Sequence, residues 1–431
     1  MVELLAPAGN KEKLLTAFHY GADACYFAGK KFGLRAFSEN FNEDELVECV
    51  ELAHKLGKKA YITVNIIAHN KDFDGLKEYL EFLQSIKVDA VIVADVGIAY
   101  FVKKYAPKLA LHISTQANIL NSYSAKFFED FGADRLILAR ELSLEEIKQI
   151  REYVGDKLEL ESFVHGAMCI SYSGRCLLSN YFAGRDSNAG ACVQACRWNY
   201  AIAEKGKDGE YYPIEEDERG TYILNSKDLC MIEYLPKLAD AGISSFKIEG
   251  RMKSQYYVAT VVNAYRRALD LYNAGKELPQ SLIDELQKAS HRKYTTGFYN
   301  PTDIVEQREY TKTSMPVQNT EFIAIVTGEW KDGYVEVEMR NRFVIGDELE
   351  ILSPDENFNK KFKIESIKNA QNEDIDDAKN VQEKYIINCP YKLNKYDILI
   401  KNAEDSYKWN LEYHTRNLAR SEKTIAELLH K

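Results

Sequence analysis

The sequence has no long apolar run, and this limits where the protein acts. No run approaches the ~18 residues that a transmembrane helix needs, so we expect no membrane span. The start of the chain, from Met1 to Pro7, lacks a basic region followed by an apolar stretch. We therefore expect no targeting segment and a cytoplasmic location.

Several catalytic signatures are missing as well. No G-x-G-x-x-G follows the first apolar run and no Walker A motif occurs, which leaves dinucleotide and nucleoside triphosphate chemistry unsupported. The hydrolase signatures G-x-S-x-G and H-E-x-x-H do not occur either. Basic residues are in deficit: 56 Lys and Arg stand against 66 Asp and Glu, a net charge of −10. Contact with a nucleic acid would therefore need a local basic patch.

Cysteine is the residue type that stands out, because four of the eight fall in one short segment. They are Cys169, Cys176, Cys192 and Cys196, with the spacing C-x6-C-x15-C-x3-C. Cytosolic thiols stay reduced, so a disulfide framework is disfavoured and a metal centre is favoured. Only the last two cysteines have a spacing typical of zinc, and the spacing matches neither ferredoxin pattern. Zinc and an iron–sulfur cluster both stay open, with Cys230 a candidate extra ligand.

Short apolar runs alternate with stretches of helical periodicity up to about residue 274. The runs lie at 4–5, 24–28, 61–65, 90–94, 111–115, 135–139, 158–164 and 245–249. Nearly continuous apolar strands separated by helices predict a parallel sheet buried on both faces. Eight such units within about 250 residues predict an α/β fold with a TIM-type (β/α)8-like barrel. A doubly wound open sheet is the alternative.

The barrel domain is predicted to cover residues 1–300. It includes the cysteine-rich cluster segment 161–196 and a polar excursion at 197–224, whose length is typical of a functional loop. Residues 301–320 are predicted to be a linker. Short alternating runs separated by turn residues predict a small antiparallel β-barrel domain at 321–405. A C-terminal helical tail is predicted at 406–431.

Polar side chains follow the predicted strands at the ends that face the active site in a parallel barrel. The candidate catalytic residues are Glu161, His165, Lys247, Glu249 and Arg251. The candidate substrate-binding residues are Asn65, Gln116, Asn118, Arg140, Asn225 and Lys227.

Each candidate also has a purely structural interpretation. Lys247 and Glu249 would form an ion pair in the barrel mouth, and His165 would be a hydrogen-bonded core histidine. Asn65 and Asn118 would be turn or cap residues. Their gathering at one end of the barrel favours a site, because polar groups at the ends of apolar strands lower stability.

Longer phrases carry a resemblance to a known family. The phrases Glu161-Ser-Phe-Val-His-Gly-Ala-Met-Cys169 and Ser173-Gly-Arg-Cys176-Leu-Leu-Ser179 resemble the signature of the collagenase-like peptidase U32 family. Lys247-Ile-Glu-Gly-Arg-Met-Lys253, with Gly184-Arg-Asp-Ser-Asn188, resembles the branch of that family that hydroxylates tRNA. The resemblance runs from Leu4 to about Tyr299 and is looser in the C-terminal module.

The resemblance implies a 4Fe–4S cluster on the four cysteines of the cluster segment. It also implies prephenate-dependent hydroxylation of the wobble uridine of tRNA to 5-hydroxyuridine, with the anticodon loop as the partner. Arg140, Lys247 and Arg251 would suit prephenate, a dicarboxylate, through charge-assisted hydrogen bonds. The chemistry needs such a cofactor, because no side chain delivers oxygen to a ring carbon unaided.

Two other functions stay open. One is the protease that the family's name describes, in which His165 near Cys169 would resemble a Cys–His pair. The other is a non-catalytic iron–sulfur partner subunit of a hydroxylase. The tRNA-branch phrases favour the RNA-modifying enzyme over both.

Overall fold

The computed structural model contains two compact units, each described here by itself. The described residues are 2–34, 39–169, 172, 175–176, 178–183, 185, 187, 191–193, 216–217, 220–221, 227–300 and 319–402. The first unit runs to Leu286 and takes in His291 to Asn300, and the second comprises Gln287–Ser290 with residues 319–402. The predicted tail at 406–431, and all of the predicted linker but its last two residues, lie outside the described residues.

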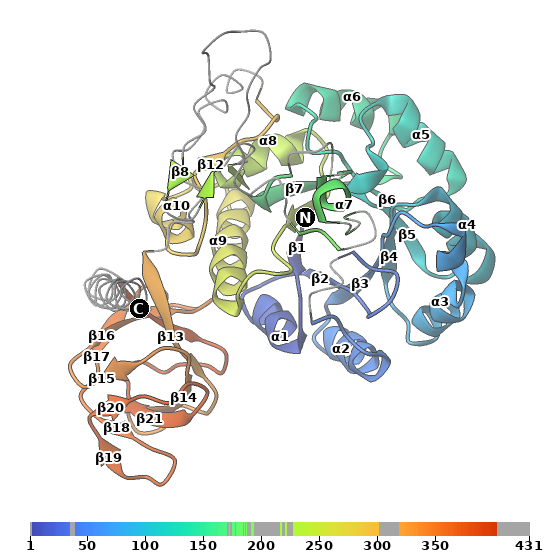
Figure 1. The fold of residues 1–431 in the computed structure, drawn as a ribbon. Coiled ribbons are helices and arrows are strands. Elements are labelled where there is room, and N and C mark those ends of the chain that lie inside the picture. Colours follow the sequence, from blue (N-terminus) through green and yellow to red (C-terminus); the bar gives the residue numbers. More distant parts are fainter. Residues whose placement is uncertain are drawn as a thin grey trace, which may run out of the picture. The chain divides into compact units, whose positions relative to one another are not determined.

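A closed barrel of parallel strands forms the first unit (Figure 1). Its strands are β1 (Glu3–Pro7), β2 (Ala24–Phe27), β3 (Lys59–Val64), β4 (Ala90–Val93), β5 (Ala110–Ile113), β6 (Arg135–Ile137), β7 (Glu159–Ala167) and β11 (Ser245–Ile248). Each strand pairs with the next, and β11 pairs in parallel with both β7 and β1. This closure confirms the predicted TIM-type barrel and excludes the open sheet.

Helices cover the outside of the barrel, as Figure 1 shows. They are α1 (Lys11–His19), α2 (Glu43–Lys55), α3 (Leu76–Ser85), α4 (Val96–Tyr105), α5 (Ser122–Phe131), α6 (Leu144–Val154), α8 (Leu235–Asp240), α9 (Gln255–Asn273) and α10 (Gln280–Leu286). Asn42 and Glu45 form a capping box at the start of α2, and Gly132, at φ 93°, ends α5 in the left-handed conformation that glycine favours.

Two short strands extend the barrel sheet, and the other short elements are not part of it. β10 (Asp228–Cys230) runs antiparallel to β7, and β12 (Tyr294–Thr295) pairs with β10. The others are α7 (Leu178–Ala183), β8 (Glu216–Asp217), β9 (Gly220–Thr221) and the 3-10 turns Asn70–Phe73, Thr115–Ala117 and Ile232–Tyr234. No helix in the described ranges combines the length and the apolar character that crossing a bilayer requires.

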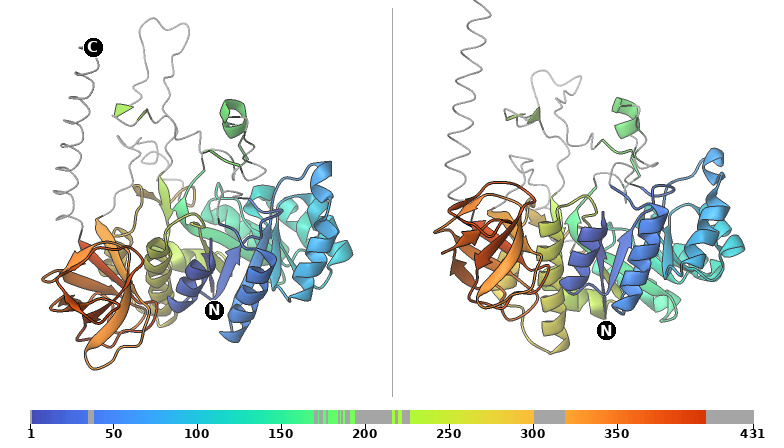
Figure 2. Two further views of the ribbon diagram at one scale, coloured as in Figure 1. Left: turned by 60° about the horizontal axis from the view of Figure 1, so that its bottom comes forward. Right: turned by 90° about the horizontal axis from the view of Figure 1, so that it is seen from below.

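The second unit is an antiparallel, curled sheet (Figure 2). Its strands are β13 (Thr320–Val326), β14 (Tyr334–Met339), β15 (Phe343–Val344), β16 (Glu348–Leu352), β17 (Lys361–Lys363), β18 (Ile367–Lys368), β19 (Asp374–Ile375), β20 (Asp377–Ala378), β21 (Lys384–Asn388) and β22 (Ile398–Asn402). Eight of them pair in the order β17-β16-β22-β13-β14-β21-β18-β19, and β15 pairs with β20. Alternate residues such as Val335, Val337 and Met339 are buried in its core, as the alternating sequence predicts.

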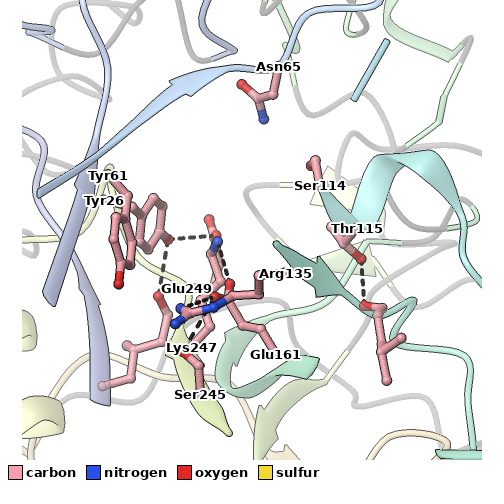
Figure 3. Close-up of polar contacts among 12 residues, drawn as sticks. Tyr26, Tyr61, Asn65, Ser114, Thr115, Arg135, Glu161, Ser245, Lys247 and Glu249 are labelled. Atoms are coloured by element: carbon pink, nitrogen blue, oxygen red, sulfur yellow. Dashed lines mark hydrogen bonds and ion pairs between the residues drawn. The ribbon is translucent and has the colours of Figure 1, made fainter. Parts of the chain in front are cut away.

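A chain of charged groups crosses the interior of the barrel (Figure 3). The Glu161 carboxylate, which is wholly buried, lies 3.0 Å from Arg135 Nη1 and 2.9 Å from Lys247 Nζ. Arg135 also contacts Glu3 at 2.5 Å. The hydroxyl of Ser245 donates to Glu3 at 2.9 Å, so four strands meet in one network. Buried charges are tolerated only when they are paired and hydrogen-bonded, as they are here.

Glu161→Gln should destabilise the barrel by about 3–5 kcal/mol, because Arg135 and Lys247 would stay buried without their shared counter-charge. Glu159 provides a matched control. Its carboxylate meets the same Arg135 guanidinium at 2.7 Å, but its side chain is 49% exposed. Glu159→Gln should therefore cost less than about 1 kcal/mol. Urea denaturation followed by circular dichroism measures both changes, and equal losses would contradict the role assigned to burial.

Candidate active site

A cavity of about 420 Å³ lies at the carboxyl ends of the barrel strands. This is the end at which side chains from different strands converge in a parallel barrel. Strand ends contribute Thr63, Asn65, Ser114, Gln116, Arg140, Ala167, Lys247, Glu249 and Arg251. The cluster segment contributes Cys169, Cys176, Leu178, Ser179, Ser187 and Cys192. Aromatic and apolar side chains, among them Tyr26 and Phe163, complete the wall.

The cavity carries an excess of positive charge. Arg140, Lys247, Arg251 and Lys253 line it, whereas Glu249 is its one carboxylate among the described residues. Opposite charges attract strongly in a partly buried space, where water screens them less. The cavity is therefore suited to an anion.

The four cations differ in how strongly other groups of the protein already bind them. Lys247 forms an ion pair with Glu161 in the barrel interior, and its Nζ lies over the ring of Tyr26, 4.4 Å from the ring centroid. Arg140 lies over the Phe163 ring at 4.7 Å and donates one hydrogen bond, to the Ala167 carbonyl at 2.8 Å. A guanidinium has five N–H donors, so Arg140 retains donors for a carboxylate.

Arg251 links two segments of the cavity wall through hydrogen bonds. It is 5% exposed, and its guanidinium donates to Thr63 Oγ1 at 3.1 Å and to the Leu34 carbonyl. The Tyr26 hydroxyl lies 3.3 Å from a carboxylate oxygen of Glu249, and Tyr257 donates to the Glu249 carbonyl at 3.0 Å. Lys247, Glu249 and Arg251 thus all lie in the cavity lining, as the sequence predicted for a site.

The other two candidate catalytic residues lie outside the lining. Glu161 belongs to the ion network in the barrel interior. His165 lies on the outer side of β7, packed against Tyr265, Tyr257 and Tyr294. Its Nδ1 is 3.2 Å from the Tyr265 hydroxyl.

A register shift in the barrel wall explains where His165 lies. Simple alternation would put 161, 163 and 165 on one face of β7. Lys247 pairs with Phe163, but the next residue, Ile248, pairs with His165, so β7 contains one extra residue at this point. A bulge of this kind reverses which face the following side chain occupies.

The candidate substrate-binding residues also divide into some that line the cavity and others that do not. Asn65, Gln116 and Arg140 line the cavity, whereas Asn118 and Lys227 do not. Asn118 instead ends the turn Thr115–Ala117 in the left-handed conformation, at φ 56°. Asn225 lies outside the described residues.

Three of the four cluster-segment cysteines, Cys169, Cys176 and Cys192, line the cavity. The fourth, Cys196, lies outside the described residues. Cys169 and Cys192 are exposed and Cys176 is partly so. Hydrogen bonds brace the segment around them: Ser187 donates to the Cys176 carbonyl at 2.5 Å, and Ser179 accepts from Val193 N–H at 3.1 Å. The described residues contain no group of three or more His, Cys, Asp or Glu placed to hold a metal ion.

The remaining cysteines have a different environment. Burial raises the pKa of Cys49 to about 12 and that of Cys389 to about 11. Cys230 is enclosed against Tyr265 rather than in the cavity, and burial raises its pKa to about 11. Metals bind thiolates, which a buried apolar setting disfavours. Among the described cysteines, the accessible thiols are those that line the cavity, and Cys230 lies outside this lining.

Comparison with known proteins identifies the family. Residues 9–309 match the model of peptidase family U32, and residues 318–399 match that of the peptidase family U32 C-terminal domain. The chain belongs to peptidase family U32. This confirms the resemblance that the cluster-segment phrases carry.

Relatives of this U32 chain include proteins named for tRNA hydroxylation and proteins named as proteases. tRNA hydroxylation protein P1 of Bacillus subtilis (strain 168) is 42% identical over 384 residues, 88% of this chain and 89% of the relative. tRNA hydroxylation protein P of Haemophilus influenzae is 38% identical over 447 residues, 93% and 96% of the two chains. Collagenase of Porphyromonas gingivalis is 32% identical over 310 residues, 69% and 73% of the two chains.

Sequence reasoning missed part of the U32 cavity wall. Tyr26 lies in a strand whose four residues are all buried, so alternation gives no sign of which one faces the cavity. Thr63 precedes the end of β3 and belongs to an apolar run. Lys253 was not missed, because it ends the charged phrase that begins at Lys247, and the sequence places it at the barrel mouth with Lys247 and Arg251.

The buried His165 predicts a pH dependence of stability. Burial, with the nearby charges of His291 and Lys253, lowers the pKa of His165 from 6.5 to about 3. The unfolded chain takes up a proton as the pH falls below 6.5, whereas the folded protein does not until about pH 3. Stability therefore falls over this window, and the share of His165 at pH 5 relative to pH 7.5 is about 2 kcal/mol.

Thermal unfolding at the two pH values tests this prediction. His165→Gln should lose less stability than the wild type between pH 7.5 and pH 5. His69 is exposed, so His69→Gln serves as the control and should keep the wild-type dependence. A wild-type dependence in the His165 variant would contradict the account.

Proposed function

We propose that this U32 chain is an enzyme that hydroxylates tRNA. In this proposal it converts the wobble uridine to 5-hydroxyuridine, with prephenate as an anionic co-substrate and a 4Fe–4S cluster as cofactor. Relatives that cover most of the chain at 38–42% identity are named for tRNA hydroxylation, which supports the reaction class. The observation that carries the proposal is one cavity lined by four cations and three accessible cysteines.

The anionic co-substrate has a natural place among these residues. A dicarboxylate needs charge-assisted hydrogen bonds from more than one direction. Arg140 and Lys253 come from different strand ends, while Lys247 and Arg251 are braced by Glu161 and by Thr63. The rings of Phe163 and Tyr26 lie against Arg140 and Lys247, and apolar surroundings of this kind strengthen electrostatic contacts.

The cysteines would hold the cofactor. Cys169, Cys176 and Cys192 have the donor chemistry and accessibility that a cluster requires, and Cys196 would complete the set. When bound, a cluster supplies electron transfer or Lewis-acid chemistry that side chains lack. The chain's own contribution is to bind and orient the anion and the base beside it, and to keep water from the reacting atoms.

Proteolysis has less support. A Cys–His pair would need His165 within reach of Cys169. Cys169 lines the cavity, but His165 is buried on the outer side of β7, where it contacts Tyr265. Among the described residues no histidine lines the cavity.

Analysis of tRNA nucleosides tests the proposed reaction. The chain should restore 5-hydroxyuridine in a bacterial strain engineered to lack it, as measured by mass spectrometry of digested tRNA. Arg140→Met should lower the product at least about tenfold, since it removes a charged donor from the cavity. Lys157 is exposed and lies before β7, at the other end of the strand, so Lys157→Met is the matched control and should retain full modification. Failure of the wild type to restore the nucleoside would contradict the proposal.

Metal analysis tests the cofactor separately. Protein purified without oxygen should contain iron and acid-labile sulfide in matching amounts. Cys169→Ala, Cys176→Ala and Cys192→Ala should each lose them. Cys230→Ala should keep them, because Cys230 lies outside the cavity lining. Stoichiometric zinc without iron in the wild type would contradict the cluster.

A further inference from the structure

Two amide side chains line the cavity, and their hydrogen bonds give them different roles. Asn65 follows β3 and Gln116 lies in the turn after β5. The Asn65 Nδ2 group donates to Gln116 Oε1 at 2.9 Å. The oxygen and nitrogen of a side-chain amide are distinguished by their hydrogen-bond partners. The partners of Asn65 and Gln116 therefore decide which of the two amides donates to the other.

A backbone N–H fixes the orientation of Asn65. The Leu34 N–H donates to Asn65 Oδ1 at 3.1 Å. A backbone N–H can only donate, so the oxygen of Asn65 must face it. The Nδ2 group is then left on the side of Gln116, where it meets an acceptor.

Asn65 in turn fixes the orientation of Gln116. Turning the Gln116 amide over would set its NH2 group against the NH2 group of Asn65, which is unfavourable. Ser114 supports the same orientation: its hydroxyl accepts from Gln116 N–H at 3.3 Å and lies 3.4 Å from Oε1 as a donor. The main chain is held too, because Arg175 Nε donates to the Gln116 carbonyl at 2.8 Å. Gln116 is only 7% exposed.

These contacts leave one group of Gln116 for a ligand. Both protein hydrogen bonds to its side chain use Oε1, and among the described residues Nε2 has no partner. Gln116 lines the same cavity as Arg140 and Arg251, so Nε2 is a fixed donor for a ligand in that cavity. A donor in a rigid position favours ligands that present an acceptor there and rejects those that present a donor.

We propose that Gln116 is a specificity-determining residue whose Nε2 donates to a carboxylate or keto oxygen of the anionic ligand. Asn65 is a positioning residue that acts through Gln116. The inference rests on the proposed function for the identity of the ligand. Beyond that function, the inference assigns different roles to two neighbouring amides: Gln116 binds the ligand and Asn65 orients Gln116.

Calorimetric titration of prephenate into the anaerobic holoenzyme tests both assignments. Gln116→Met has similar length and no charge, and should weaken binding about tenfold or more through loss of one hydrogen bond to an ionised group. Asn65→Asp keeps the acceptor for Leu34 N–H but now accepts from Gln116, whose amide turns over and presents oxygen to the ligand. It should weaken binding to a similar extent.

The double variant separates positioning from direct effects. With Met at 116 there is no amide to turn over, so adding Asn65→Asp then measures only the repulsion between its new charge and the anion, and it should weaken binding by a clearly smaller factor than it does in the wild type. Penalties that multiply would show that Asn65→Asp acts by its own charge or by altered folding, and would overturn the role of Asn65. If Gln116→Met leaves prephenate binding unchanged, the roles of Gln116 and of Asn65 are both overturned, while prephenate stays the proposed co-substrate. A wild type that does not bind prephenate would overturn the proposed co-substrate and this inference with it.

Discussion

The Glu161 carboxylate, buried between Arg135 and Lys247, is the interaction on which the arrangement of the barrel depends. It joins β6, β7 and β11, and β11 is the strand that closes the ring. A buried charge cannot stay unpaired, so these strands must keep their register. The same contact supports the cavity, because Lys247 is at once the partner of Glu161 and part of the cavity wall.

The protein's own side chains and backbone hold the cations of the cavity in place. Glu161 compensates Lys247 from below, and Arg251 is committed to Thr63 and to the loop at Leu34. Arg140 uses one donor for the Ala167 carbonyl and keeps the rest. The molecule thus holds its cations in place before a ligand arrives, which lowers the entropy lost on binding. Accessible thiols beside these cations bring the proposed cofactor and anion into the same space.

The barrel was predictable from the sequence because its strands are apolar runs separated by capped helices. The polar ends of β3, β5 and β11 were predictable for the same reason, since a parallel barrel gathers them at one end. His165 was not, because one extra residue in β7 reverses its face and only the pairing with β11 reveals it. Glu161 shares the face of Phe163, but its depth in the barrel depends on the stagger of neighbouring strands. The different roles of Asn65 and Gln116 depend on the backbone N–H of Leu34, thirty-one residues before Asn65 in the sequence.

The central claim is that the anion and the cysteine-bound cofactor occupy one cavity. Electron–nuclear double resonance measures it directly, on anaerobic protein with a reduced cluster and prephenate labelled with carbon-13 at its carboxylates. The account predicts a carbon-13 hyperfine coupling to the cluster that disappears when unlabelled prephenate replaces the labelled compound. A cluster signal with no such coupling at saturating prephenate would place the anion elsewhere and contradict the account.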